Sequence, residues 1–271
     1  MTYHGVFKVK SGQSLCASLG FLSLLYYLLI RFPKGIPRLL LLPPIIYLFY
    51  LIPWYSSSSL LRGVSSFFLT WIASFKLLLF CFDQGPLANC KSYLDFVLVS
   101  IFPLKIKESQ TPSNVQFMSL YESVSLFNKP YLATSLQDFW GRRWNRYSSN
   151  ILRMTINDPT RKTLTGIVGI QSAKVMALML TLVVSGIMHE MLFYFITCAK
   201  KPTWEVTWFF VLQGLCMALE AVLKKLARAN GWTQVHPAVS RSLTCGFVVA
   251  TFYGLLVLPV WRNGQNDCGF R

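Results

Sequence analysis

Two features of this sequence could take part in chemistry, and the first is a histidine within an apolar run. His189 lies in the largely apolar stretch of residues 166–199, and Glu190 follows it directly. Ionisable side chains are costly inside a membrane and are kept there mostly for a transport path or a reaction. A neutral imidazole can accept the proton of a hydroxyl group. We expect His189 to be a buried general base or a transport-path residue; the alternative is a helix break that places it at the membrane interface.

The residues around His189 make this expectation more specific. Ser185 and Gly186, about one turn earlier, are small and are expected to leave space beside the imidazole. Phe193 stands where the HExxH pattern of zinc proteases would carry its second histidine, so we expect no metal site.

The second feature is a dense cluster of polar and aromatic residues at positions 137–145. Ser135 and Asp138 have the spacing of a capping box, which predicts a helix over residues 135–151. One face of that helix would carry Trp140, Trp144, Tyr147 and Ile151, and another Asp138, Arg142 and Asn145.

Two interpretations of this helix are open. It could lie in the membrane interface with its aromatic rings in lipid and its arginines on headgroups. It could instead form an anion site, because the planar arginine fork matches phosphate oxygens. Asp138 and Asn145 favour the anion site slightly, since a headgroup binder needs neither.

The elements that position these residues are predicted to be membrane spans. Of the 271 residues 54% are hydrophobic and 13% charged, whereas soluble domains carry about a quarter charged residues. The net charge of +16 is typical of basic loops that anchor spans, and it can also attract phosphates. Nucleic acid is not an expected partner, because long apolar runs interrupt the charge.

The apolar runs predict an all-α, polytopic transmembrane bundle of about six to eight hydrophobic segments with an amphipathic interfacial helix. Three prolines predict a kink in the second span, and Lys76 lies in mid-span without an evident role. The candidate spans are residues 15–30, 39–55, 64–82, 166–188 or beyond, 204–223 and 242–261, with a shorter segment at 93–104.

The domain organisation follows from these runs. We expect N-terminal spans over residues 1–104, a polar connection with the motif helix over 105–165, histidine-bearing spans over 166–261 and a polar tail over 262–271.

Several motifs resemble those of the plant wax synthases, the long-chain-alcohol O-fatty-acyltransferases related to membrane-bound O-acyltransferases. The clearest is residues 128–145, NKPYLATSLQDFWGRRWN, and a second is residues 185–190, SGIMHE, which contains His189. Residues 33–39, PKGIPRL, and 80–87, FCFDQGPL, are also similar.

The resemblance implies transfer of a fatty acyl group from acyl-CoA to a long-chain alcohol in the endoplasmic reticulum membrane. It gives His189 the catalytic role, with Asn145 as its polar partner. As a hypothesis of the mechanism, Glu190 orients His189 indirectly, since neighbours in sequence point to different helix faces. Acyl-CoA is a co-substrate, and no cofactor is implied. The implied acyl-CoA site consists of Asp138, Trp140, Arg142, Arg143 and Trp144.

Other functions remain open at this point. The acceptor could be a sterol rather than a fatty alcohol, with the same chemistry. The resemblance also implies further hydrophobic segments between residues 106 and 128, where this chain is short and polar, so it could be a truncated, inactive paralogue. A non-enzymatic transporter could use His189 and Glu190 as a proton relay, although no repeated halves are visible. The sequence leaves acyl-chain preference, membrane orientation and oligomeric state undetermined.

Overall fold

The computed structural model describes residues 26–106 and 121–264, except residues 28, 57, 91 and 234. Most of the expected span at residues 15–30, residues 107–120 of the polar connection and most of the C-terminal tail lie outside the described residues. Two compact units form, residues 1–124 and 125–271, called here the N-terminal and C-terminal units.

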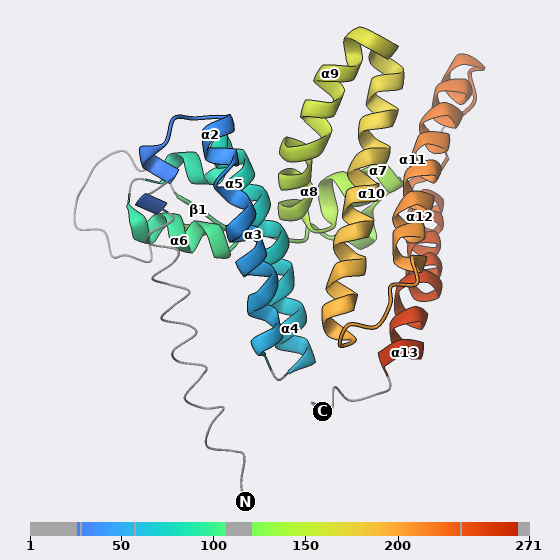
Figure 1. The fold of residues 1–271 in the computed structure, drawn as a ribbon. Coiled ribbons are helices and arrows are strands. Elements are labelled where there is room, and N and C mark those ends of the chain that lie inside the picture. Colours follow the sequence, from blue (N-terminus) through green and yellow to red (C-terminus); the bar gives the residue numbers. More distant parts are fainter. Residues whose placement is uncertain are drawn as a thin grey trace, which may run out of the picture. The chain divides into compact units, whose positions relative to one another are not determined.

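The described elements are helical apart from one short strand pair, which confirms the predicted helical membrane bundle (Figure 1). Each segment that is long and apolar enough to cross a membrane corresponds to one of the predicted spans. These segments are Ile36–Tyr55, Ser59–Cys81, Ile170–Ile196, Glu205–Ala229 and Pro237–Arg262.

The first of these segments is interrupted, as its prolines predict. A short helix α2 (Ile36–Leu39) ends in a turn, α3 (Leu42–Leu51) begins with two prolines, and the 3-10 helix η1 (Ile52–Tyr55) begins with Pro53 in its first turn. Proline is tolerated in a first turn because the N–H group it lacks would have no partner within the helix.

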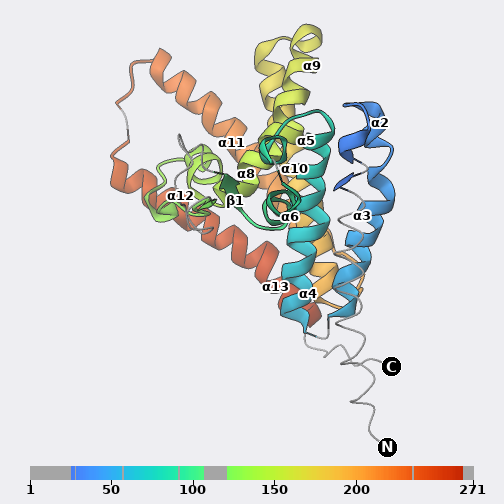
Figure 2. The same cartoon turned by 90° about the vertical axis from the view of Figure 1, so that its left-hand side faces the viewer.

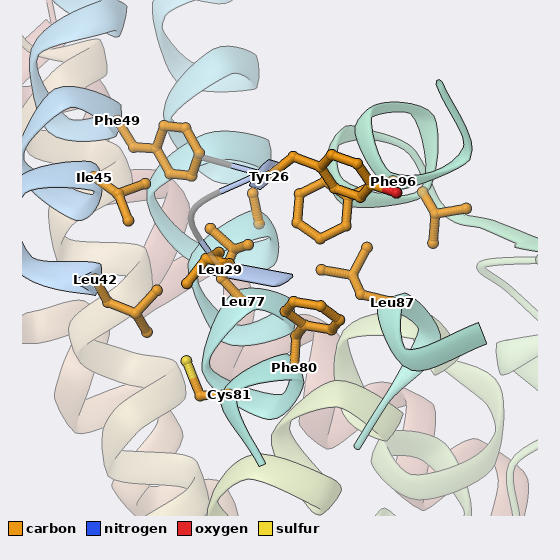
Figure 3. Packing of buried hydrophobic residues seen from close by; sticks show 12 residues of the cluster. Tyr26, Leu29, Leu42, Ile45, Phe49, Leu77, Phe80, Cys81, Leu87 and Phe96 are labelled. Carbon is orange, nitrogen blue, oxygen red and sulfur yellow. The ribbon is translucent and has the colours of Figure 1, made fainter. Parts of the chain in front are cut away.

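The second segment is one long helix with a π-helical middle. It consists of α4 (Ser59–Ser66), η2 (Phe67–Ala73) and α5 (Ser74–Cys81). Leu77 and Phe80 of α5 pack with Ile45 of α3 and Phe96 of a later helix in the core of the N-terminal unit (Figure 3).

A short helix and a strand pair complete the N-terminal unit. After the 3-10 helix η3 (Pro86–Asn89), α6 (Tyr93–Ile101) begins with a full capping box between Ser92 and Asp95. The strand β1 (Leu104–Ile106) then pairs antiparallel with β2 (Tyr121–Ser123).

Lys76 receives a structural explanation that the sequence does not offer. Its side chain is fully buried, and its ammonium group donates hydrogen bonds to the carbonyl oxygens of Val99, Ser100 and Phe102. These carbonyls lie at or just beyond the C-terminal end of α6, where a helix lacks donors and its dipole favours a cation. Lys76 therefore caps α6.

The C-terminal unit begins with short helices and ends with long ones. The elements in chain order are η5 (Pro130–Leu132), α7 (Leu136–Asp138), η6 (Phe139–Arg143), α8 (Arg146–Leu152), η7 (Arg153–Asn157), α9 (Asp158–Val168), α10 (Ile170–Ile196), α11 (Glu205–Ala229), α12 (Pro237–Phe252), η8 (Tyr253–Val257) and α13 (Leu258–Gly264).

The helix α10 is continuous through His189. It follows a reversal at Gly169, whose φ of 80° suits glycine, and α9 lies antiparallel beside its first half (Figure 1). The alternative of a helix break at His189 is therefore wrong. His189 belongs to an unbroken helix long enough to span a membrane.

The helices α11 and α12 diverge toward the loop that joins them, and the chain that precedes α8 lies between them (Figure 2). A carboxylate oxygen of Glu220 in α11 accepts a hydrogen bond from the amide of Leu136, 3.0 Å away. The thiol of Cys245 in α12 lies 3.6 Å from the carbonyl oxygen of Tyr131. Both long helices thus hold the segment that carries the motif. Glu220 also forms an ion pair with Lys224, at 2.7 Å.

Candidate active site

The helix predicted over residues 135–151 starts where expected but is broken in the middle. The hydroxyl of Ser135 accepts a hydrogen bond from the amide of Asp138 at 3.0 Å, as an N-cap does. At Trp144 the backbone becomes extended, and Asn145 adopts a left-handed conformation with φ 38°. The predicted uninterrupted helix is therefore wrong, because Asn145 starts a second helix.

Asn145 is one of the few residue types that tolerate this conformation. Its Oδ1 atom accepts a hydrogen bond from the amide of Ser148 at 3.3 Å, which caps α8. Because Oδ1 serves the cap, the Nδ2 group is the part of the side chain left for a ligand. Among the described residues no hydrogen bond joins Asn145 to His189.

The aromatic side chains of the motif pack inside the C-terminal unit. The rings of Phe139 and Trp144 stack with 5.5 Å between centroids, and Trp140 meets Phe209 of α11 edge-on at 5.9 Å. These rings belong to one core cluster with residues of α10, α11 and α12. This arrangement argues against the interpretation in which the rings lie in lipid.

The three arginines of the motif region have different surroundings. Arg143 is paired with Asp138, at 2.6 Å, and also donates to the backbone carbonyls of Asn128 and Lys129. Arg142 is exposed, and so is Arg146 at the start of α8; neither side chain makes an ion pair or hydrogen bond within the described part of the chain. The structure therefore separates a structural arginine from two that face outward. Sequence reasoning did not single out Arg146.

His189 is held by its own helix. Its Nδ1 atom lies 2.7 Å from the carbonyl oxygen of Ser185, one turn earlier. A carbonyl can only accept, so Nδ1 must carry the proton, and the neutral ring then has its lone pair on Nε2. The ring is half-buried, and its centroid lies 4.6 Å from that of Phe210 in α11. This geometry presents Nε2 as a base.

The prediction that Gly186 leaves space beside the imidazole is wrong, because α11 occupies that space. A Cβ atom at Gly186 would lie 2.9 Å from the Cα atom of Thr207, and one at Gly214 would lie 2.7 Å from the Sδ atom of Met179. Membrane helices use small residues in this way to bring their backbones close. The glycines let α10 and α11 pack tightly and place Phe210 against His189.

Among the described residues Glu190 makes no hydrogen bond with the imidazole of His189. Its side chain is buried, and its Oε1 atom accepts a hydrogen bond from the backbone amide of Thr207 at 3.1 Å. Thr207 lies in the first turn of α11, where amide groups lack helical partners and the dipole favours an anion. Glu190 therefore caps α11 and ties its start to α10.

Gln213 is a further site residue that the sequence analysis missed. It is fully buried in α11, accepts a hydrogen bond from the indole of Trp140 at 3.1 Å, and donates to the hydroxyl of Thr251 in α12 at 2.9 Å. A glutamine within a predicted span was the available signal, since a polar group in a membrane requires partners.

A half-open pocket lies where α10 ends and α11 begins, and its empty space of about 320 Å³ includes open solvent. The residues that line it include Glu190, Lys200 and Lys201, together with Pro259 of α13. Within the described residues, no three side chains of the His, Cys, Asp and Glu types are grouped as a metal site would need.

One family model and several known proteins are similar to this chain in the region of the site. Residues 123–212, which include the motif and His189, match the model of the membrane bound O-acyl transferase family. The probable long-chain-alcohol O-fatty-acyltransferase 3 of Arabidopsis thaliana is 35% identical, with 90% of this chain and 87% of the relative covered. The long-chain-alcohol O-fatty-acyltransferase of Simmondsia chinensis is 36% identical, with 86% and 84% covered.

A relative with a different acceptor is similar to nearly the same degree. The acyl-CoA–sterol O-acyltransferase 1 of Arabidopsis thaliana is 34% identical, with 81% of each chain covered. The alignment with the first Arabidopsis relative is 299 positions long and so exceeds the 271 residues of this chain. That relative therefore contains segments with no counterpart here.

Proposed function

Because the chain belongs to the plant long-chain-alcohol O-fatty-acyltransferases, or wax synthases, of the membrane bound O-acyl transferase family, we propose that it esterifies a long-chain alcohol with the acyl group of acyl-CoA. It is an integral membrane protein and an O-acyltransferase. The observation that carries the proposed reaction is the geometry of His189, whose Nδ1 donates to Ser185 and whose Nε2 has the lone pair of a base.

In the proposed reaction Nε2 of His189 accepts the proton of the alcohol while the alcohol oxygen attacks the thioester carbonyl. The tetrahedral intermediate then expels the CoA thiolate, which takes the proton from the imidazolium. The products are an ester and free CoA, and no acyl-enzyme forms because a thioester is already activated. The Nδ2 group of Asn145 donates to the oxyanion or orients the substrate; such a donor typically contributes about 3 kcal/mol.

The surroundings of the motif residues lead us to propose different roles within the set assigned to acyl-CoA. Asp138 and Arg143 neutralise each other, and the partly buried Trp140 and Trp144 pack against the core, so we propose that these four shape the site rather than meet the phosphates. We propose that Arg142, the exposed member of the set, binds a phosphate. Arg146, exposed as well, joins it in the proposal.

The proposed acceptor is a fatty alcohol, and a sterol is the second candidate. The similarity to an acyl-CoA–sterol O-acyltransferase at 34% identity favours keeping it, since the acceptor depends on the shape of the apolar site and not on the base. We also propose the endoplasmic reticulum as the membrane in which the enzyme acts.

The test uses microsomes from a host that lacks its own neutral-lipid acyltransferases. Labelled palmitoyl-CoA is supplied with hexadecanol or with a sterol, and labelled ester is quantified for the wild type, His189→Ala and the control His236→Ala. His236 is exposed and precedes α12. Ester formation that His189→Ala abolishes and His236→Ala retains is the expected result, and the preferred acceptor identifies the substrate. No ester from folded wild-type protein would support an inactive paralogue and contradict the proposal.

A further inference from the structure

Gln213 connects three elements of the C-terminal unit through a single side chain. A buried amide is costly unless both of its ends are hydrogen-bonded, and here both are. The indole of Trp140 in η6 donates to Oε1, and Nε2 donates to the hydroxyl of Thr251 in α12. That hydroxyl in turn lies 2.7 Å from the carbonyl oxygen of Phe247, to which it donates.

The direction of these hydrogen bonds follows from chemistry. The indole N–H of Trp140 is a donor only, so the amide must turn its oxygen toward it. The Nε2 group of Gln213 then faces Thr251, whose hydroxyl passes its own hydrogen to Phe247. Each of these three hydrogen bonds therefore has one defined direction.

The same face of α11 carries the ring that contacts the base. Phe210 precedes Gln213 by three residues, a spacing that places two side chains on one helix face. The ring of Trp140 lies 5.8 Å from that of Phe210, which in turn lies 4.6 Å from the imidazole of His189. Trp140 thus lies between the amide network and the ring against which His189 packs.

We propose that Gln213 is a positioning residue that holds Trp140 against Phe210 and so fixes the imidazole of His189 for proton transfer. This inference rests on the proposed function. It assigns Gln213 no contact with substrate and predicts an effect on the rate of the chemical step rather than on acyl-CoA binding.

Three variants of purified full-length protein test this role. Gln213→Met keeps the length and removes both hydrogen bonds, and Gln213→Glu keeps the acceptor. The control is Gln171→Met, which makes the same replacement of glutamine by methionine at an exposed position of α10. We expect Gln213→Met to lower kcat about tenfold or more with KM for palmitoyl-CoA changed less than about twofold, since small misplacements of catalytic groups are costly in rate. A normal kcat, or a loss that lies mainly in KM, would overturn the proposal.

The Gln213→Glu variant adds a readout that loss of packing would not produce. Its protonated carboxyl can still donate to Thr251, whereas the ionised form cannot. We expect its kcat relative to wild type to recover as the pH is lowered, while Gln213→Met shows no such recovery. Equal pH profiles for the two variants contradict the proposal.

Two further measurements keep the test decisive if Gln213→Met folds poorly or the wild type makes no ester. Trp140→Phe retains a ring and removes the N–H donor. The double variant Trp140→Phe/Gln213→Glu should lose less kcat than the losses of the two single variants combined. Additive effects contradict the coupling. Independently of turnover, mass spectrometry of the carbethoxylation of His189 should show faster modification in Trp140→Phe than in wild type. An inactive wild type contradicts the proposed function alone, whereas unchanged carbethoxylation contradicts the positioning role.

Discussion

The imidazole of His189 packs against the phenyl ring of Phe210 with an interplanar angle of 37°. The bond from Nδ1 to Ser185 fixes the tautomer and one edge of the imidazole, and the neighbouring helix supports its face. Two helices therefore orient the base together. The position of Nε2 depends on how closely α10 and α11 pack.

Replacement of Phe210 tests this dependence directly. Phe210→Ala removes the support for the imidazole face, so kcat should fall by about tenfold or more, because the base then samples unproductive orientations. Phe210→Leu restores some bulk and should give an intermediate rate. Initial rates with saturating palmitoyl-CoA measure the effect. Equal rates for Phe210→Ala and wild type would show that the hydrogen bond to Ser185 orients His189 alone.

Replacements of Glu190 distinguish a role as the cap of α11 from a role in catalysis. Glu190→Ala removes the acceptor for the amide of Thr207 and should destabilise the protein by about 1–2 kcal/mol, the range typical of a lost helix cap. Glu190→Gln retains a carbonyl acceptor and should keep both most of the stability and the shape of the pH–rate profile. Thermal denaturation in detergent and a pH series measure the two quantities. A large loss of kcat in a stable Glu190→Gln protein would instead support a direct catalytic role.

We expect Arg142 and Arg143 to have different roles, the first in binding acyl-CoA and the second in stability. Arg142→Gln should raise KM for palmitoyl-CoA and leave the denaturation midpoint unchanged, because the Arg142 side chain is exposed and makes no intramolecular pair among the described residues. The size of the increase should shrink at high salt, where phosphate contacts are screened.

Arg143 should behave in the opposite way. Arg143→Gln breaks the ion pair with Asp138 and the contacts that hold residues 128 and 129, so it should lower stability. A double-mutant cycle with Asp138→Asn should show non-additive losses, since the two groups interact directly. Stability losses that simply add would show that the pair contributes nothing to the motif.

Several of these relationships could be predicted from the sequence and others could not. Apolar run length predicted the five described spans well, because a membrane imposes a fixed length on a helix. Spacing predicted the N-cap at Ser135, which is a local interaction. The break at Asn145 escaped prediction because periodicity assumes an uninterrupted helix, and the left-handed turn depends on tertiary packing.

Residue roles that depend on a partner distant in the sequence were also missed. Lys76 caps a helix some 24 residues later, and Gln213 joins Trp140 to Thr251. The sequence marks each as a polar group that needs partners in an apolar environment, but it does not say where the partners lie. Gly186 was misinterpreted for the same reason, since only the position of α11 shows that its missing side chain admits a neighbouring backbone.

Replacement of Gly186 therefore tests how closely α10 and α11 must pack. Gly186→Ala places a Cβ atom 2.9 Å from the Cα atom of Thr207, a contact with backbone that no rotamer change relieves. We expect α10 and α11 to separate slightly, with a loss of about 1–3 kcal/mol of stability as in other overpacked cores. Because Phe210 moves with α11, kcat should fall as well.

Gly246→Ala in α12 is the matched control, since nothing lies within 4 Å of a Cβ atom at that position. Denaturation midpoints and initial rates of the two variants separate the local contact from the general effect of replacing glycine in a helix. A Gly186→Ala protein as stable and active as Gly246→Ala would mean that α10 and α11 are not held at this distance, and the support of His189 by Phe210 would lose its basis.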